Sequence, residues 1–124
     1  MKNSARNSRL ATGQIGEEIA RKYLEKKGYK IIEKDFKTKY AEVDLAGIKD
    51  NELVIFEVRT KRGEMFGSPE DTLNRKKLGK VWLGARILAA AKKWQGPLRI
   101  DAVCLVLGEG NDALRINHYE NIIN

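Results

Sequence analysis

The feature that most constrains this chain is a pair of alternating segments on either side of Asp50-Asn51. Residues 40–48 and 52–60 alternate side chains with the two-residue period of a β-strand. Asp and Asn are common turn residues, so the segments predict a β-hairpin. With a two-residue or symmetric four-residue turn, the numbers of paired residues sum to 101, as those of the turn residues do. A three-residue turn would shift this register by one.

Two opposed carboxylates are the chemical consequence of this register. Asp44 lies opposite Glu57, with paired Cβ atoms about 4.5–5.5 Å apart. Glu42 lies opposite Arg59. Facing carboxylates repel unless one is protonated or a cation lies between them, and Mg²⁺ suits two carboxylates with water and phosphate oxygens. The alternative is a ladder of surface salt bridges in which Arg59 and Lys61 neutralise the acids.

The two faces of the predicted hairpin differ in character. One face is almost wholly apolar, whereas the other is apolar near the turn and ionic further away. A sheet face that changes character in this way usually borders a cleft. The apolar face consists of Ala41, Val43, Leu45, Val54, Phe56, Val58 and Thr60, and the ionic end consists of Glu42, Asp44, Glu57, Arg59 and Lys61.

The flanking segments carry helix and strand signals in a fixed order. Ser68-Pro69-Glu70-Asp71 combines an N-cap, a proline at the first helical position and acids in the first turn, which predicts a helix start. The expected helices are residues 12–27 and 68–94, the second interrupted near Asn74, and the expected strands are residues 29–36, 40–48, 52–60, 98–107 and 114–119. Residues 1–11 lack periodicity and are expected to form a flexible basic arm before a single domain, residues 12–124.

Composition narrows the class of protein. The chain has 124 residues, one Cys and one His, which excludes a disulfide framework and multi-Cys or multi-His metal centres. It has neither an apolar run of membrane-spanning length nor an apolar N-terminal stretch, so we expect a soluble, cytoplasmic protein. Asp101 lies inside an apolar strand and is expected to pair with Arg99 or a basic helix residue. Structural roles are expected for His118 and Cys104.

The charge of the chain is basic and uneven. Lys and Arg number 24 against 17 Asp and Glu, for a net charge of +7, and residues 75–99 hold eight basic side chains and no acid. Basic flanks around an acidic centre suggest a polyanion bound over a cation, although such residues also simply solvate helix faces. The candidate nucleic-acid contacts are Lys61, Arg62, Arg75, Lys76, Lys77 and Lys80.

A third acid accompanies the hairpin pair. Glu17 lies at the edge of the apolar stripe of the first predicted helix, about 20° from Leu24 on a helical wheel, while Glu18 points away. A carboxylate at such an edge can be half-buried and reach into a cleft. An ordinary boundary glutamate would occupy the same position.

Together these acids resemble the PD-(D/E)xK, or restriction-endonuclease-like, nuclease superfamily. Its pattern is an acid on the first helix, an Asp on the second strand and a (D/E)-x-K triplet on the third, here Glu17, Asp44 and Glu57-Val58-Arg59. Within it the chain most resembles the uncharacterised YraN-like bacterial family, from about Gly13 to Asn121. The matching segments are 13–20, 41–45, 56–59, 66–69, the Lys76/Lys77 region and 99–101. The chain is also similar to archaeal Holliday-junction resolvases.

The resemblance implies both a fold and a site. The fold class is α/β, with an α-β-β-β-α-β core whose mixed central sheet is flanked by helices. The implied catalytic residues are Glu17, Asp44, Glu57 and Arg59, and the implied ligands of Mg²⁺, or Mn²⁺ in its place, are Asp44, Glu57 and the Val58 carbonyl. The metal would activate a water for attack on a phosphodiester.

Two positions depart from the superfamily pattern. Arg59 stands where the triplet has Lys, and an arginine stays protonated, so it can orient water or stabilise charge but cannot act as a general base. Lys61, two residues along the same strand face, could substitute for it or be an ordinary exposed residue at the strand end. Ala41 stands where the family usually has Gly.

Three hypotheses about function follow. The first is a divalent-metal-dependent endonuclease that hydrolyses phosphodiester bonds in DNA, branched or structured DNA included. The alternative is a catalytically silent nucleic-acid-binding module that retains the nuclease fold, and a weaker third is an adaptor that pairs through the last strand. We expect a nucleic-acid partner, DNA rather than RNA, with no membrane and no small-molecule cofactor. A homodimer would place one site at each strand of a duplex.

Overall fold

The computed structural model describes residues 4–123, with the side chains of residues 8–123. The fold is mixed α/β, as predicted, and the order α-β-β-β-α-β is followed by a fifth strand. Neither helix in this part of the chain has the length and apolarity needed to cross a bilayer. The elements are α1 (Ser4–Lys26), β1 (Lys30–Lys37), β2 (Glu42–Lys49), β3 (Glu52–Arg62), the short 3₁₀-helix η1 (Pro69–Thr72), α2 (Arg75–Ala91), β4 (Leu98–Leu107) and β5 (Ala113–Tyr119).

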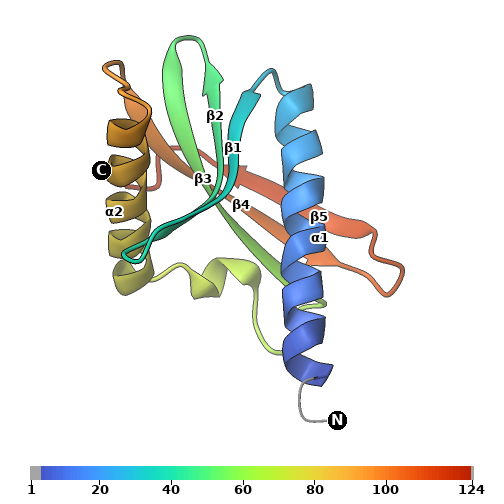
Figure 1. The fold of residues 1–124 in the computed structure, drawn as a ribbon. Coiled ribbons are helices and arrows are strands. Elements are labelled where there is room, and N and C mark those ends of the chain that lie inside the picture. Colours follow the sequence, from blue (N-terminus) through green and yellow to red (C-terminus); the bar gives the residue numbers. More distant parts are fainter. Residues whose placement is uncertain (1–3, 124) are drawn as a thin grey trace.

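One five-stranded sheet, in the order β1-β2-β3-β4-β5, forms the centre of the molecule. β3 and β4 are parallel and are joined by the crossover through η1 and α2, whereas all the other neighbours are antiparallel. The two helices lie on opposite sides of the sheet (Figure 1). Because α2 must cover one face to complete the crossover, α1 is left to cover the other.

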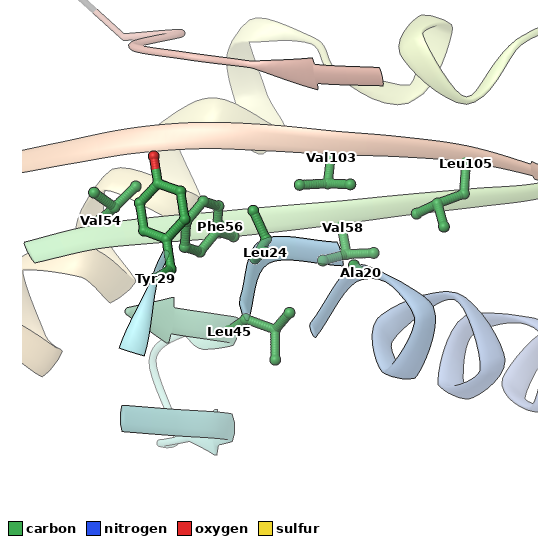
Figure 2. Packing of buried hydrophobic residues seen from close by; sticks show 9 residues of the cluster. All are labelled: Ala20, Leu24, Tyr29, Leu45, Val54, Phe56, Val58, Val103 and Leu105. Carbon is green, nitrogen blue, oxygen red and sulfur yellow. The ribbon is translucent and has the colours of Figure 1, made fainter. Parts of the chain in front are cut away.

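The core under α1 joins the helix to the three central strands. Ala20 and Leu24 of α1 are fully buried and face side chains of β2, β3 and β4, as Figure 2 shows. Tyr29 packs edge-on against Phe56, with 5.0 Å between ring centroids. Burying such apolar side chains stabilises the fold by about 1.5–3 kcal/mol each. The remaining members of this cluster are Leu45, Val54, Val58, Val103 and Leu105.

The core under α2 fastens the helix to β2. Gly84 of α2 lies so close to that strand that a Cβ on it would be 2.9 Å from the Glu42 carbonyl oxygen and 3.2 Å from Val43 Cγ2. The absence of a side chain at this position therefore allows the close approach. This second cluster consists of Val43, Ala46, Leu53, Ile55, Val81, Ala85, Leu88 and Ile100.

The hairpin has the predicted register over its first half only. β2 and β3 pair from Lys49 and Glu52 at the turn to Leu45 and Phe56, and the numbers of each pair sum to 101 as expected. Beyond that pair the two strands separate. β2 bends toward α2 together with β1, while β3 continues alongside β4 (Figure 1). We call this separation, immediately beyond Leu45 and Phe56, the β2–β3 fork.

The fork corrects two expectations from the sequence. Val43 was expected on the face of Leu45, but it packs under α2, so the alternation of β2 breaks at the residue between them. Glu42 was expected opposite Arg59, but it pairs with Lys37 of β1. Close packing of β2 on α2 pulls this end of the strand away from β3.

Helix α1 begins earlier than the sequence indicated. It starts at Ser4 rather than near Thr12, so the predicted arm is helical from residue 4, while residues 1–3 lie outside the described part of the chain. Residues 4–11 have no apolar periodicity in their sequence, and Leu10 is exposed. Elongating a formed helix costs far less than nucleating one, and this segment has neither Pro nor Gly before Gly13. The periodicity of apolar residues therefore could not indicate that α1 starts at Ser4.

The predicted interruption near Asn74 is confirmed. Ser68 caps η1 through a capping box with Asp71, whereas Asn74 caps α2 by accepting a hydrogen bond from the Lys77 N–H at 2.9 Å. Two separate N-caps divide the predicted helix into two pieces. The division matters for the site, because it sets where the first turn of α2 points.

A buried ionic network holds β4 to β5 and to the start of β1. Asp101 is fully buried and accepts hydrogen bonds from Arg99 at 2.8 and 2.9 Å and from the Asn121 N–H at 2.9 Å. His118 Nε2 lies 2.7 Å from Oδ2 of Asp101, and Arg99 also donates to the Tyr29 hydroxyl at 2.7 Å. The predicted pairing of Asp101 with Arg99 is confirmed, and His118 has the structural position expected for it.

Candidate functional site

Two acidic side chains meet at the β2–β3 fork. The β2–β3 ladder ends at Leu45 and Phe56, and on the side away from the turn Asp44 is next to Leu45 and Glu57 is next to Phe56. Val58 has no ladder partner in β2, and its N–H donates instead to Oδ2 of Asp44 at 2.9 Å. The carboxyl group of Glu57 is close enough to raise the pKa of Asp44, both through its charge and through side-chain hydrogen bonding. The predicted neighbours are therefore in contact, held by the fork and not by a regular strand pair.

The pair is electrostatically strained. Burial and, second to it, the nearby charge of Glu57 raise the pKa of Asp44 from 3.8 to about 7. The Val58 N–H and the Lys77 ammonium act in the opposite direction. Glu57 is itself only 3% exposed. Two carboxylates held together out of water favour binding a proton or a cation.

Glu17 approaches the same pair from α1. Its pKa is raised from 4.5 to about 8, mainly by burial and also by a hydrogen bond to Asp35 and by the charges of Asp44 and Glu57. Asp35 has a left-handed backbone conformation, with φ of 50°, inside β1. The position of Glu17 was predictable from the sequence, whereas that of Asp35 was not. An acid with positive φ inside a strand leaves no periodic signal that would have identified it.

Arg59 is held in place from both sides. Its Nε donates to the Thr72 hydroxyl of η1 at 2.6 Å, and its terminal nitrogen lies 3.3 Å from Glu57 Oε2. The Thr72 hydroxyl in turn donates to the Pro69 carbonyl at 2.6 Å. The guanidinium therefore has a fixed position beside the carboxylates. Nothing in the sequence indicated Thr72 as its partner.

Lys77 is a cation whose position beside Glu57 was not predicted from the sequence. Its Nζ lies 3.3 Å from Glu57 Oε2, the same oxygen that Arg59 contacts. The first turn of α2 delivers it, because the Asn74 cap fixes where that turn begins. The sequence grouped Lys77 with its exposed neighbour Lys76 as a phosphate contact. Only the crossover brings one of the two to the fork.

A basic cleft opens next to these residues, between the N-terminal half of α1 and the far half of β3. We call it the α1–β3 cleft; its volume is about 520 Å³. Glu17 and Arg59 belong to its wall, so the cleft leads to the fork. Lys61 lines it and does not join the ion pairs there, and Arg62 bonds the Gly108 carbonyl at 2.9 Å. The lining residues are Ser8, Arg9, Thr12, Gly13, Glu17, Val58, Arg59, Thr60, Lys61, Arg62 and Thr72.

The remaining predicted contacts lie along the outside of α2. Arg75, Lys76 and Lys80 are exposed on its first two turns. They continue the basic surface of Lys77 but do not reach the carboxylates. The structure therefore brings together Glu17, Asp44, Glu57, Arg59 and Lys77, while the other basic candidates remain at the surface or along the cleft.

The donor set limits how a metal could bind. No group of three Asp, Glu, His or Cys side chains in the described part of the chain is arranged to hold an ion. Asp44 and Glu57 nevertheless offer two buried carboxylates that repel one another. A pair of this kind fits Mg²⁺, which binds one or two carboxylates and keeps several waters or phosphate oxygens.

Comparison with known sequences places this chain in a family. The sequence pattern of the uncharacterised protein family UPF0102 matches residues 16–105, more than half of the chain. The chain belongs to the UPF0102 family. The YraN-like resemblance noted in the sequence is thereby confirmed.

Individual UPF0102 proteins match over nearly their whole length. One from Syntrophomonas wolfei is 39% identical over 110 residues, which cover 88% of this chain and 94% of the relative. One from Caldanaerobacter subterraneus is 35% identical over 116 residues, covering 92% and 95%. One from Thermotoga maritima is 38% identical over 106 residues, covering 86% and 91%. Each match thus covers most of this chain and most of the relative.

The residues matched by the UPF0102 pattern contain the entire fork. They run from the middle of α1 into β4 and so include Glu17, Asp44, Glu57, Arg59 and Lys77. They exclude β5 and the first turns of α1. The candidate site thus lies within the part of the chain that defines UPF0102.

Proposed function

We propose that this protein is a divalent-metal-dependent endonuclease that hydrolyses phosphodiester bonds in DNA, with branched or structured DNA within its substrate class. The observation that carries the proposal is the contact between Asp44 and Glu57 at the end of a basic cleft. Two buried carboxylates held against their mutual repulsion are costly unless a cation uses them. The cleft offers a path of positive charge for a phosphate backbone.

Each residue of the fork has a role in this proposal. Asp44 and Glu57 would hold Mg²⁺ or Mn²⁺, with the Val58 carbonyl as a further ligand and Glu17 acting directly or through water. When bound, the ion would supply a Lewis acid that activates water and stabilises charge developing on the phosphate. Arg59, fixed by Thr72, would orient a phosphate oxygen.

Lys77 would supply the compact positive charge that the strand triplet lacks. Its ammonium lies at the same Glu57 oxygen as Arg59, but it comes from a different element and is one-third exposed. A scissile phosphate entering beside Glu57 would therefore meet two cations, one from β3 and one from α2. Together they would neutralise part of the charge that accumulates during hydrolysis.

The test is cleavage of end-labelled single-stranded, duplex, flapped and four-way DNA with Mg²⁺ or Mn²⁺. We expect Asp44→Asn and Glu57→Gln to lower the rate by at least about 100-fold, since each removes a ligand of the ion. Glu18→Gln is the matched control, because Glu18 is the exposed neighbour of Glu17 and its ion-pair partner is Arg21. Cleavage that survives Asp44→Asn in a folded protein would contradict the proposal.

A second candidate function is a catalytically silent nucleic-acid-binding module. The observation that favours it is that Arg59 and Lys77 already neutralise Glu57, which is the salt-bridge alternative for this hairpin. Such a module would bind DNA with the same affinity in EDTA as in Mg²⁺, and the affinity would fall steeply with salt. Binding that required a divalent ion would exclude it.

A further inference from the structure

Two large apolar side chains are exposed to solvent beside the α1–β3 cleft. Phe66 is 90% exposed and Met65 is 86% exposed, more than any other large hydrophobic residue in the described part of the chain. They are adjacent in the loop of residues 63–68, so they form a single apolar tip. Neither contributes to either core cluster. The folded protein alone gives no reason for this exposure.

The base of this loop is held firmly. The Gly63 N–H donates to the Leu107 carbonyl at 3.1 Å, and Gly67 returns to the Glu64 carbonyl at 3.3 Å. Both glycines have positive φ, +71° and +110°, a conformation that other residues rarely adopt. Arg115 of β5 ties the loop down through Glu64 at 3.3 Å. The tip is therefore presented from an anchored base, which lowers the entropic cost of binding.

The loop lies between two elements that line the α1–β3 cleft, so a ligand in the cleft could also cover the tip. It connects Arg62 to η1, and both Arg62 and Thr72 of η1 line the α1–β3 cleft. In Figure 1 it runs from the lower end of β3 to η1. The acids at its base do not repel a polyanion, because Arg115 neutralises Glu64 and, at 2.6 Å, Glu70.

We infer that Met65 and Phe66 stack on unpaired bases of a nucleic acid whose backbone lies in the α1–β3 cleft. The inference rests on the proposed function and narrows its substrate to nucleic acid with a single-stranded segment. A flat apolar base suits an aromatic side chain, and the phosphates next to it suit Arg9, Lys61 and Arg62 in the cleft. A second copy of the chain fits the tip less well, because both copies carry a net charge of +7.

The experiment measures binding in EDTA, so that cleavage plays no part. Wild type, Phe66→Ala, Phe66→Trp and Leu114→Ala are titrated against a blunt duplex and against the same duplex with a single-stranded flap that carries 2-aminopurine. Leu114 is the matched control, a large apolar side chain that is 64% exposed on β5. Gel filtration of each variant reports the oligomeric state.

Stacking predicts a loss confined to the flapped DNA. Phe66→Ala should weaken flap binding by about 5- to 100-fold and abolish the quenching of 2-aminopurine, with duplex affinity changed less than about 2-fold. Phe66→Trp should retain both, and Leu114→Ala should match wild type. Equal flap affinities for Phe66→Ala and Leu114→Ala would overturn the inference, as would a dimer that Phe66→Ala dissociates while flap binding stays unchanged.

The proposed function is tested separately by the acids and the cleft. If a Lys61→Gln, Arg62→Gln variant binds both DNAs more weakly and Asp44→Asn stops cleavage, the nuclease proposal survives even when Phe66→Ala has no effect. Failure of the wild type to bind any of the DNAs would overturn both. The two failures are therefore distinguishable.

Discussion

Gly16 sets the distance between α1 and β3, and replacing it tests the packing that positions Glu17. A Cβ on residue 16 would lie 1.9 Å from the Thr60 hydroxyl oxygen and 2.8 Å from Thr60 Cβ and Cγ2. No side-chain rotation relieves all three overlaps, because Thr60 Cβ is fixed to the strand. In Gly16→Ala, α1 must therefore move away from β3 and carry Glu17 with it.

The size of the effect follows from comparison with a second glycine of the same helix. Gly13→Ala gains the same helix propensity, about 1 kcal/mol, but its Cβ would have nothing within 4 Å. Overpacking at residue 16 costs about 1–3 kcal/mol. Gly16→Ala should therefore be about 1–3 kcal/mol less stable than Gly13→Ala. For 124 residues this difference corresponds to about 4–12 °C in Tm.

Thermal and urea unfolding followed by circular dichroism measure both variants. Thr60→Ala removes the hydroxyl that collides and that has no hydrogen-bond partner within the described structure, so alone it should be close to neutral. Combined with Gly16→Ala it should recover part of the lost stability, giving an interaction energy of at least about 0.5 kcal/mol. Equal stability of Gly16→Ala and Gly13→Ala would refute the close approach of α1 to β3.

Three further predictions concern charged groups. In metal-free protein the raised pKa of Asp44 means that the folded state loses stability as pH rises from 3.8 through about 7. Asp44→Asn should therefore be about 1–4 kcal/mol more stable than wild type at pH 8 and nearly equal to it at pH 4. Chemical denaturation in EDTA measures both free energies of unfolding. In the cleavage assay Lys77→Met should slow the reaction by about 10-fold or more while Lys76→Met does not, and equal rates would place Lys77 outside the site. Burial raises the pKa of Asp101, but the hydrogen bonds that its carboxylate accepts lower the pKa more, so the carboxylate stabilises the fold above pH 3.8 and this stabilisation is lost below it. Asp101→Asn should lower the free energy of unfolding at pH 7 by about 3–5 kcal/mol. It should also flatten the acid side of the curve of stability against pH.

The elements of this fold were largely determined by local sequence. The capping box at Ser68 and the Asn74 cap act within three residues, so a break between η1 and α2 could be predicted without any tertiary information. The hairpin register followed in the same way from the turn and the alternation of its strands, and it holds from the turn to Leu45 and Phe56. Signals of this kind fail where the local pattern is silent, as at the start of α1.

The candidate acids were also visible in the sequence, because the resemblance and the register pointed to the same side chains. Their contact could be predicted, but the way it is made could not. The ladder ends one pair before Asp44 because packing of Gly84 and Val43 draws β2 toward α2. That contact joins residues about forty positions apart, and no local periodicity encodes it.

Only the tertiary structure decided which cations contact the acids at the fork and where the tip of the 63–68 loop lies. Lys76 and Lys77 are equivalent in sequence, yet the crossover from β3 to β4 turns one toward Glu57 and leaves the other in water. Glu17 and Asp35 likewise meet because α1 packs across the sheet against β1. The sequence by itself determined the strands, the helices and the identity of the acids, since these depend on neighbours along the chain. The partners of those acids depend on how distant elements pack, and the physical reason is that burial and charge are set by the whole fold.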